Sequence, residues 1–133
     1  MEDQVKITPR VLQRDGFDEK HPAFDCFVAD HDGSIVGYAL YYTCYSTWVG
    51  KSVFLEDLYV RSDYRSLGVG LELFQSVGRV AHETSHRMDF HVLSWNPATQ
   101  FYEKLGAVNL TSAEKWQVYR MGEEALRKLV ERQ

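Results

Sequence analysis

The chain has 133 residues, 44% of them hydrophobic, which suits one domain that buries about two-thirds of its unfolded surface. A formal charge of −4 without a Lys/Arg cluster argues against nucleic acid or an anionic membrane as partner, and no run of about 18 apolar residues predicts a membrane span. Two cysteines, Cys26 and Cys44, are too few for a disulfide framework and are interpreted as buried free thiols. Because the N-terminus lacks a signal-peptide pattern, we expect a cytoplasmic protein with a single domain over residues 1–133.

The first half of the chain predicts a short helix and an antiparallel meander. A helix is expected over residues 8–16, with Thr8 as its cap, Pro9 in its first position and Gly16 as its stop. Strands are expected over residues 25–30, 35–42 and 53–60. Asp32-Gly33 supplies the positive φ angles of a tight hairpin turn, so the first two strands should be antiparallel neighbours.

The second half predicts helices alternating with strands. Leu71, Phe74, Val77 and Ala81 recur at helical spacing, so a helix beginning near Gly70 should pack on the sheet. A strand over residues 88–94 should pair parallel with residues 53–60 if the two share a sheet, because the helix between them makes a right-handed crossover connection. The remaining expected elements are a helix capped by Asn96 with Pro97 in its first position and Gly106 at its end, closing strands over 107–110 and 116–121, and a C-terminal helix carrying Leu126, Leu129 and Val130.

The clearest chemical signal follows the strand over residues 53–60. Two adjacent acids, Glu56 and Asp57, interrupt its apolar run, and burying acids costs free energy unless they have partners or a task. The loop Arg65-x-x-Gly68-x-Gly70 then opens a helix, whose N-terminal N–H groups attract anions. This arrangement predicts a pyrophosphate site, but it matches neither the dinucleotide fingerprint nor the P-loop. Taken alone, these six residues fit an ordinary strand-to-helix turn equally well.

The order of these elements resembles the GNAT superfamily of N-acetyltransferases. The runs Leu55-Glu56-Asp57-Leu58-Tyr59-Val60, Ser62-Asp63-Tyr64-Arg65 and Tyr45-Ser46-Thr47-Trp48 are similar to the spermidine/spermine (diamine) N-acetyltransferase group and its thialysine-acetylating relatives. The resemblance implies an α/β (α+β) fold with a twisted, mixed, mostly antiparallel sheet, a central parallel strand pair and flanking helices. It also implies a homodimer, acetyl-CoA as co-substrate without a metal, and a small cationic amine as acceptor. The family's usual first strand and first helix have no counterpart, and we expect them to be missing.

The resemblance also implies roles for individual residues. Tyr102 matches the family's general acid, and Glu56, Asp57 and Glu114 match the region that faces the amine. The positions that match cofactor contacts are Leu58, Tyr59, Val60, Arg65, Ser66, Leu67, Gly68, Val69, Gly70, Leu71, Asn96, Pro97, Ala98, Thr99 and Tyr102.

These residue types suit acetyl transfer to an amine. An alkylamine has a pKa near 10 and must lose a proton before its lone pair attacks a thioester. Glu56 could accept that proton directly or through water, or only hold the cation; with regular alternation it would share a strand face with Phe54, Leu58 and Val60. Tyr102 can protonate the leaving thiolate. From spacing alone, Tyr102 also fits a core aromatic, while Glu56 and Glu114 fit surface acids.

Three other interpretations fit parts of the sequence. An acyl-enzyme on cysteine is disfavoured because no base flanks Cys26 or Cys44, so direct attack in a ternary complex is expected. A non-catalytic acyl-CoA-binding domain would keep the glycine loop without using Tyr102. The run His82-Glu83-Thr84-Ser85-His86 matches the H-E-x-x-H motif of zinc hydrolases, but it lies where the helix is expected to end and lacks an evident third ligand.

Overall fold

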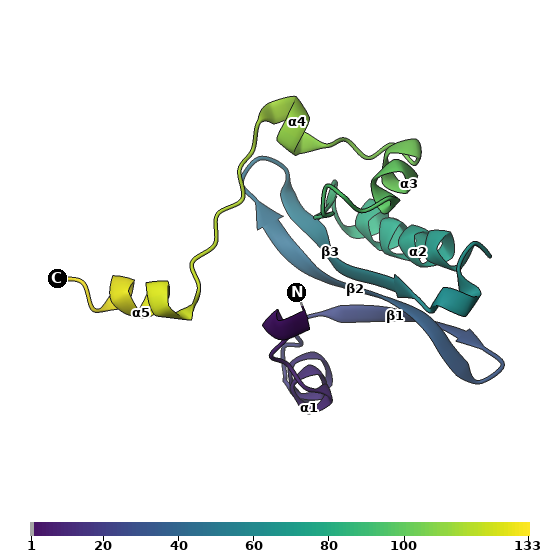
Figure 1. Ribbon diagram of the computed structural model, residues 1–133, viewed down its shortest axis with the longest axis horizontal. Helices are drawn as coiled ribbons and strands as arrows, with labels where there is room; N and C mark the ends of the chain where they lie inside the picture. The colour runs from purple at the N-terminus through teal and green to yellow at the C-terminus, as the bar shows by residue number, and fades with distance from the viewer. Residues whose placement is uncertain (1) are drawn as a thin grey trace. The chain divides into compact units, whose positions relative to one another are not determined.

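The computed structural model describes residues 2–133. The chain divides into two compact units, Met1–His91 and Val92–Gln133. Each unit is described by itself below. The first unit contains the sheet and its packed helix (Figure 1). Its elements are η1 (Glu2–Gln4), α1 (Pro9–Gln13), η2 (Arg14–Asp18), β1 (Asp25–His31), β2 (Ser34–Ser46), β3 (Gly50–Val60), η3 (Ser62–Tyr64), α2 (Val69–Thr84) and β4 (Met88–Phe90).

The four strands form one sheet in the order β1-β2-β3-β4. The sheet is mixed and mostly antiparallel, which confirms the predicted α/β (α+β) fold class. The pairs β1–β2 and β2–β3 are antiparallel, and β3–β4 is parallel. Asp32 and Gly33 form the first hairpin turn with φ of 49° and 85°, which confirms the predicted positive φ angles. The parallel pairing is short: only Val53, Phe54 and Leu55 face β4 residues, so the predicted strand over residues 88–94 ends at Phe90.

Helix α2 covers one face of the sheet and supplies half of the core (Figure 1). Leu73, Val77 and Ala81 are buried on this helix at intervals of four residues, which places them on one face. They pack with the buried strand residues Ala39, Val53 and Leu55, and with half-buried residues from all four strands. Burial of branched side chains against a strand face therefore fixes the position of α2 on the sheet.

The N-terminal helix begins as predicted but does not stop at Gly16. The Thr8 side chain accepts a hydrogen bond from the Val11 N–H at 3.3 Å, and Pro9 occupies the first turn. The chain then continues through the π-helical turn η2, which includes Gly16. A Cβ on Gly16 would lie 2.3 Å from the Phe24 ring. Gly16 thus permits close packing of Phe24 rather than ending the helix.

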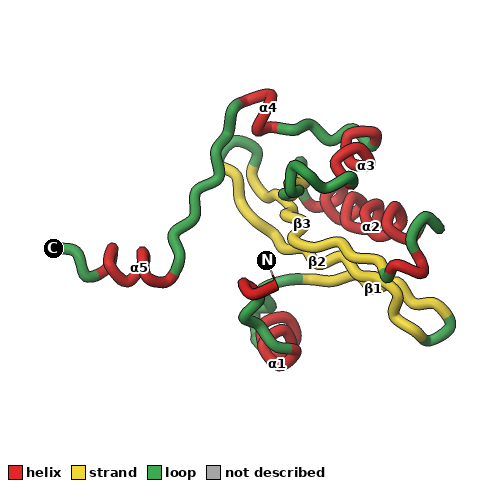
Figure 2. Tube along the Cα trace, in the orientation of Figure 1, coloured by secondary structure: helices red, strands yellow, loops and turns green. Residues whose placement is uncertain are grey.

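The second unit contains three short helices: α3 (Ala98–Lys104), α4 (Leu110–Glu114) and α5 (Glu123–Val130). Helix α5 confirms the predicted C-terminal helix. The two predicted closing strands are wrong, because Asn109 instead caps α4 with its side chain and residues 116–121 form no strand. Figure 2 shows the stretch between α4 and α5 as a loop. No helix within residues 2–133 is both long and apolar enough to cross a bilayer.

Candidate active site

A β-bulge turns both acids of β3 away from the core. On β2, Leu40 pairs with Asp57 and the next residue, Tyr41, pairs with Leu55, so Glu56 has no register partner. The core-facing positions of β3 are accordingly 53, 55, 58 and 60, with an interval of three where regular alternation would give two. Glu56 therefore shares a face with Phe54 but not with Leu58 and Val60, which corrects the expectation from regular alternation. Both acids are exposed.

Asp57 is held by a neighbouring strand. The Tyr38 hydroxyl donates a hydrogen bond to Asp57 Oδ2 at 2.5 Å, and the Tyr38 ring lies 6.0 Å from the Tyr59 ring. Burial, followed by this hydrogen bond and the charge of Asp57, raises the pKa of Tyr38 well above its usual value. Tyr38 therefore remains protonated and acts as a donor over the physiological pH range.

Glu56 has an aromatic neighbourhood. Tyr42 stacks on Phe54 with ring centroids 5.3 Å apart, and His91 meets the same Phe54 edge-on at 5.0 Å. Burial first and the charge of Glu56 second raise the pKa of Tyr42. The bulged acid thus lies near the tyrosine of an aromatic cluster on the sheet face opposite α2.

The glycine loop has the backbone that the sequence suggests. Ser66 and Gly68 have φ of 65° and 86°, and Gly68 is the N-cap of α2 without a side-chain cap. A Cβ on Gly68 would meet no heavy atom within 4 Å, so the backbone faces open space here. The first N–H groups of a helix have no acceptor within the helix. A 16-residue helix with an open, glycine-bearing N-terminus fits an anionic group such as a diphosphate.

Arg65 ties this loop to the end of β3. Its Nε donates to the Val60 carbonyl oxygen at 2.9 Å, and its guanidinium lies 5.7 Å from the centre of the Tyr59 ring. On the other side of β3, pairing to β4 stops at Leu55. Among residues 2–133, residues 57–60 of β3 thus pair only with β2, which leaves one main-chain edge beside the loop.

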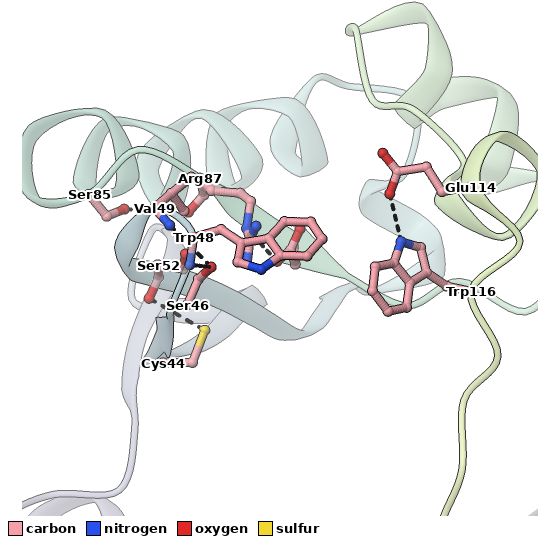
Figure 3. Close-up of polar contacts among 10 residues, drawn as sticks. Cys44, Ser46, Trp48, Val49, Ser52, Ser85, Arg87, Glu114 and Trp116 are labelled. Carbon is pink, nitrogen blue, oxygen red and sulfur yellow. Dashed lines mark hydrogen bonds and ion pairs between the residues drawn. The ribbon is translucent and has the colours of Figure 1, made fainter.

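The remaining predicted site residues belong to the second unit. Asn96 Oδ1 accepts from the Ala98 N–H at 2.9 Å, but Pro97 is the N-cap position and α3 begins at Ala98, one residue later than expected. Tyr102 is half-buried on α3 and meets Phe101 edge-on at 5.1 Å. Glu114 Oε2 accepts a hydrogen bond from the Trp116 indole at 2.6 Å (Figure 3).

Comparison with known proteins decides the family. The Acetyltransferase (GNAT) family matches residues 2–107. The chain belongs to the GNAT acetyltransferase family. A thialysine N-epsilon-acetyltransferase from Sus scrofa is 41% identical to it over 97% of this chain and 81% of the relative. A spermidine/spermine N(1)-acetyltransferase-like protein from Homo sapiens is 36% identical over 95% of this chain and 19% of the relative.

Solved GNAT-like structures agree with the fold. An integron cassette protein from V. cholerae has a TM-score of 0.75 and 26% identity, covering 85% of this chain and 70% of its own. An aminoglycoside N-acetyltransferase in complex with CoA has a TM-score of 0.62 and 24% identity, covering 77% of this chain and 79% of its own. This GNAT protein is therefore an N-acetyltransferase, of a family that uses acetyl-CoA.

The geometry of the H-E-x-x-H run does not suit zinc in this acetyltransferase. Helix α2 ends at Thr84, so His82 lies on its last turn while His86 lies beyond it. The two imidazoles therefore do not share a helix face as the motif requires. Across the described residues, 2–133, no three or more His, Cys, Asp or Glu side chains are grouped to hold a metal ion.

Neither cysteine of this acetyltransferase is set up as a nucleophile. Both are free, but Cys26 is exposed rather than buried as expected, because it lies on β1 on the sheet face opposite α2. Partial burial nevertheless raises the pKa of the Cys26 thiol, which makes it less nucleophilic at neutral pH. The Cys44 thiol is directed to the Ser52 carbonyl oxygen at 3.5 Å (Figure 3).

The sequence did not identify Tyr38 as the hydrogen-bond partner of Asp57. The cross-strand neighbour of an acid depends on register, and the bulge at Glu56 shifts that register by one residue. The signal in the sequence is weak: two consecutive acids within an apolar strand indicate that alternation fails, but they do not identify the facing side chain.

Proposed function

We propose that this protein transfers the acetyl group of acetyl-CoA to a primary amine of a small cationic substrate, a polyamine or diamine or a thialysine-like amino acid. The observation that carries the proposal is the bulge of β3. It presents Glu56 and Asp57 on one sheet face, in the strand that precedes the loop to the open helix N-terminus at Gly68. An acidic cation site and a diphosphate site are thereby joined by one short segment of chain.

Acetyl-CoA would bind along this segment. The N–H groups of the first turn of α2, together with Ser66 and Leu67 of the loop, would hold the diphosphate. The main-chain edge of Leu58, Tyr59 and Val60 would bind the pantetheine arm by strand-like hydrogen bonds. Residues 96–99 at the start of α3 would complete the contacts, as the family resemblance implies.

Glu56 is proposed as the proton acceptor. The amine nitrogen loses one proton to Glu56, directly or through water, and its lone pair then attacks the thioester carbonyl carbon. As the tetrahedral adduct collapses, the C–S bond breaks and the thiolate takes a proton from the Tyr102 hydroxyl. The nitrogen's second proton restores that hydroxyl, so the reaction yields an amide, CoA thiol and one released proton.

Direct attack is proposed because neither thiol is activated. Cys26 has a raised pKa, and Cys44 is directed to a main-chain carbonyl. A transient acyl-cysteine would need a thiolate and a base beside it.

A cation with more than one charge fits the acids best. Glu56 and Asp57 offer two negative charges on adjacent residues, and the family resemblance implies that Glu114, which Trp116 holds, also faces the amine. The relatives from Sus scrofa and Homo sapiens are named for thialysine and for spermidine/spermine, which are amines of this kind. The protein is further proposed to be cytoplasmic and a homodimer. The dimer is tested by solution mass across a concentration series, where a constant monomer mass would contradict it.

A thiol-release assay tests the function. The full chain is incubated with acetyl-CoA and spermidine, thialysine, lysine or n-butylamine, and free CoA thiol is followed. We expect turnover with spermidine or thialysine and a lower kcat/KM for the singly charged n-butylamine. Absence of thiol release with every amine, at concentrations where CoA binds, would overturn the proposal.

Two matched variants locate the chemistry. Glu56→Gln should lower kcat about 100-fold, because general base catalysis contributes roughly 100-fold or more. Glu83→Gln removes an equally exposed carboxylate at the far end of α2 and should leave turnover unchanged. An equal loss of turnover in Glu83→Gln would show that the effect of Glu56→Gln is not specific to the acid of the bulge.

A further inference from the structure

The contact between Tyr38 and Asp57 joins two strands on the face that carries the acids. In the β2–β3 register, Tyr38 pairs with Tyr59 and Leu40 pairs with Asp57, so Tyr38 and Asp57 are diagonal neighbours. The hydroxyl reaches Asp57 Oδ2 at 2.5 Å. Hydrogen bonds to a carboxylate are stronger and more directional than those between neutral groups, so this bond fixes how the Asp57 side chain lies.

The two acids are therefore held differently. Asp57 has one oxygen engaged by Tyr38, and within residues 2–133 no second side chain bonds its carboxylate, which is exposed. Glu56 occupies the bulge and is exposed, and its carboxylate makes no hydrogen bond or ion pair with another of the described residues, 2–133. A fixed carboxylate suits an anchor for a cation, whereas a mobile one suits a group that must approach, take a proton and release it.

We propose that Tyr38 is a positioning residue for the acceptor amine: it holds Asp57 so that the free carboxylate oxygen anchors an ammonium group, which leaves proton acceptance to Glu56. The inference rests on the proposed function and adds a division of roles between the two acids. It predicts that the acceptor carries a second cationic group besides the amine that reacts.

The surroundings of Tyr38 preserve this geometry. Its ring packs on Tyr59, and Tyr59 in turn lies under the Arg65 guanidinium, which is bound to the Val60 carbonyl oxygen. The phenol ring can therefore stay in place when only the hydroxyl is removed. Burial and the charge of Asp57 also keep the Tyr38 hydroxyl protonated, so it remains a donor throughout the pH range of the assay.

Kinetics of Tyr38→Phe test the role. The KM for spermidine should rise about tenfold, the effect of losing one hydrogen bond to a charged group. The kcat should stay within about twofold, and the KM for acetyl-CoA should not change. Tyr41→Phe is the matched control: Tyr41 belongs to the same strand but packs on Phe27 in the core, and its variant should match the parent in all three values.

A double-mutant cycle separates positioning from a general structural role. With Asp57→Asn already present, adding Tyr38→Phe should change the spermidine KM less than about twofold, because the charged anchor that Tyr38 positions is already removed. A tenfold rise in that background, or an unchanged KM in Tyr38→Phe alone, would overturn the proposal. If Tyr38→Phe does not fold, Asp57→Glu decides, since it keeps the charge but moves the carboxylate by one methylene. A spermidine KM for Asp57→Glu equal to that of the parent would overturn the proposal.

The two proposals fail in different ways. A parent protein that binds CoA in calorimetry but neither binds nor acetylates any amine overturns the proposed function, and the positioning role with it. A parent that acetylates spermidine while Tyr38→Phe shows the same kinetics overturns the positioning role alone.

Discussion

Replacing Gly68 by alanine tests the loop most directly. Gly68 has φ 86° and ψ 0°, a left-handed conformation that costs an L residue about 1–2 kcal/mol. The added methyl would meet no heavy atom within 4 Å, so backbone conformation alone should determine the cost. Gly68→Ala should therefore lower the free energy of unfolding by about 1–2 kcal/mol.

The same methyl should also weaken cofactor binding. It projects from the backbone where the diphosphate would approach the first N–H groups of α2. Loss of one good amide–phosphate contact is worth about 1.4 kcal/mol, so the dissociation constant of CoA should rise about tenfold.

Gly78→Ala is the matched control. Gly78 lies inside α2 at ordinary helical φ, and its added methyl would also meet nothing within 4 Å. Alanine is the better helix former, so this variant should gain about 0.5–1 kcal/mol in the free energy of unfolding. Its affinity for CoA should equal that of the parent.

Urea unfolding and calorimetric titration with CoA measure both quantities. The reasoning about the backbone is refuted if Gly68→Ala is as stable as the parent. The reasoning about the site is refuted if Gly68→Ala loses stability as expected yet binds CoA with the parent's dissociation constant. In that case the diphosphate does not lie on this loop.

Three further predictions concern the core, the chemistry and pH. Val77 is fully buried, so Val77→Ala should lower the free energy of unfolding in urea by about 1.5–3 kcal/mol. Val130 is 82% exposed, so Val130→Ala should lower it by less than about 0.5 kcal/mol. Equal losses in the two variants would contradict the assignment of Val77 to the core. Tyr102→Phe should lower kcat about 100-fold with little change in the KM for acetyl-CoA, and an unchanged kcat would mean that another group protonates the thiolate. Above about pH 10 the free energy of unfolding of the parent should fall more steeply with pH than that of Tyr38→Phe, because an unfolded tyrosine ionises there while folded Tyr38 keeps its proton. If the free energies of unfolding of the two proteins fall in parallel from about pH 9 to 11, Tyr38 does not cause the loss of stability.

The sequence predicts those parts of the fold that local chemistry determines. Thr8 and Pro9 begin a helix because their preferences act within one turn, and Asp32-Gly33 makes a hairpin because its φ angles are intrinsic. The closing strands fail for the opposite reason. Asn109 satisfies two N–H groups of α4 itself, while the alternating residues 116–121 meet no partner strand among residues 2–133.

The same distinction between local and long-range determinants applies to the candidate site. The glycine loop could be placed from Gly68 and Gly70 because helix termini and positive φ are local properties. The face of Glu56 could not, since a bulge depends on how two strands pair. Likewise the partners of Asp57 and Glu114, Tyr38 and Trp116, lie in neighbouring structure that composition alone does not specify.

The extra residue in β3 has a consequence for how such proteins diversify. Because Glu56 is excluded from the ladder register and the interior, exchanging its side chain alters neither strand alignment nor hydrophobic packing. Position 56 can therefore vary almost without a stability penalty. A different proton acceptor can therefore take the place of Glu56 at this one site, while the scaffold around it stays unchanged.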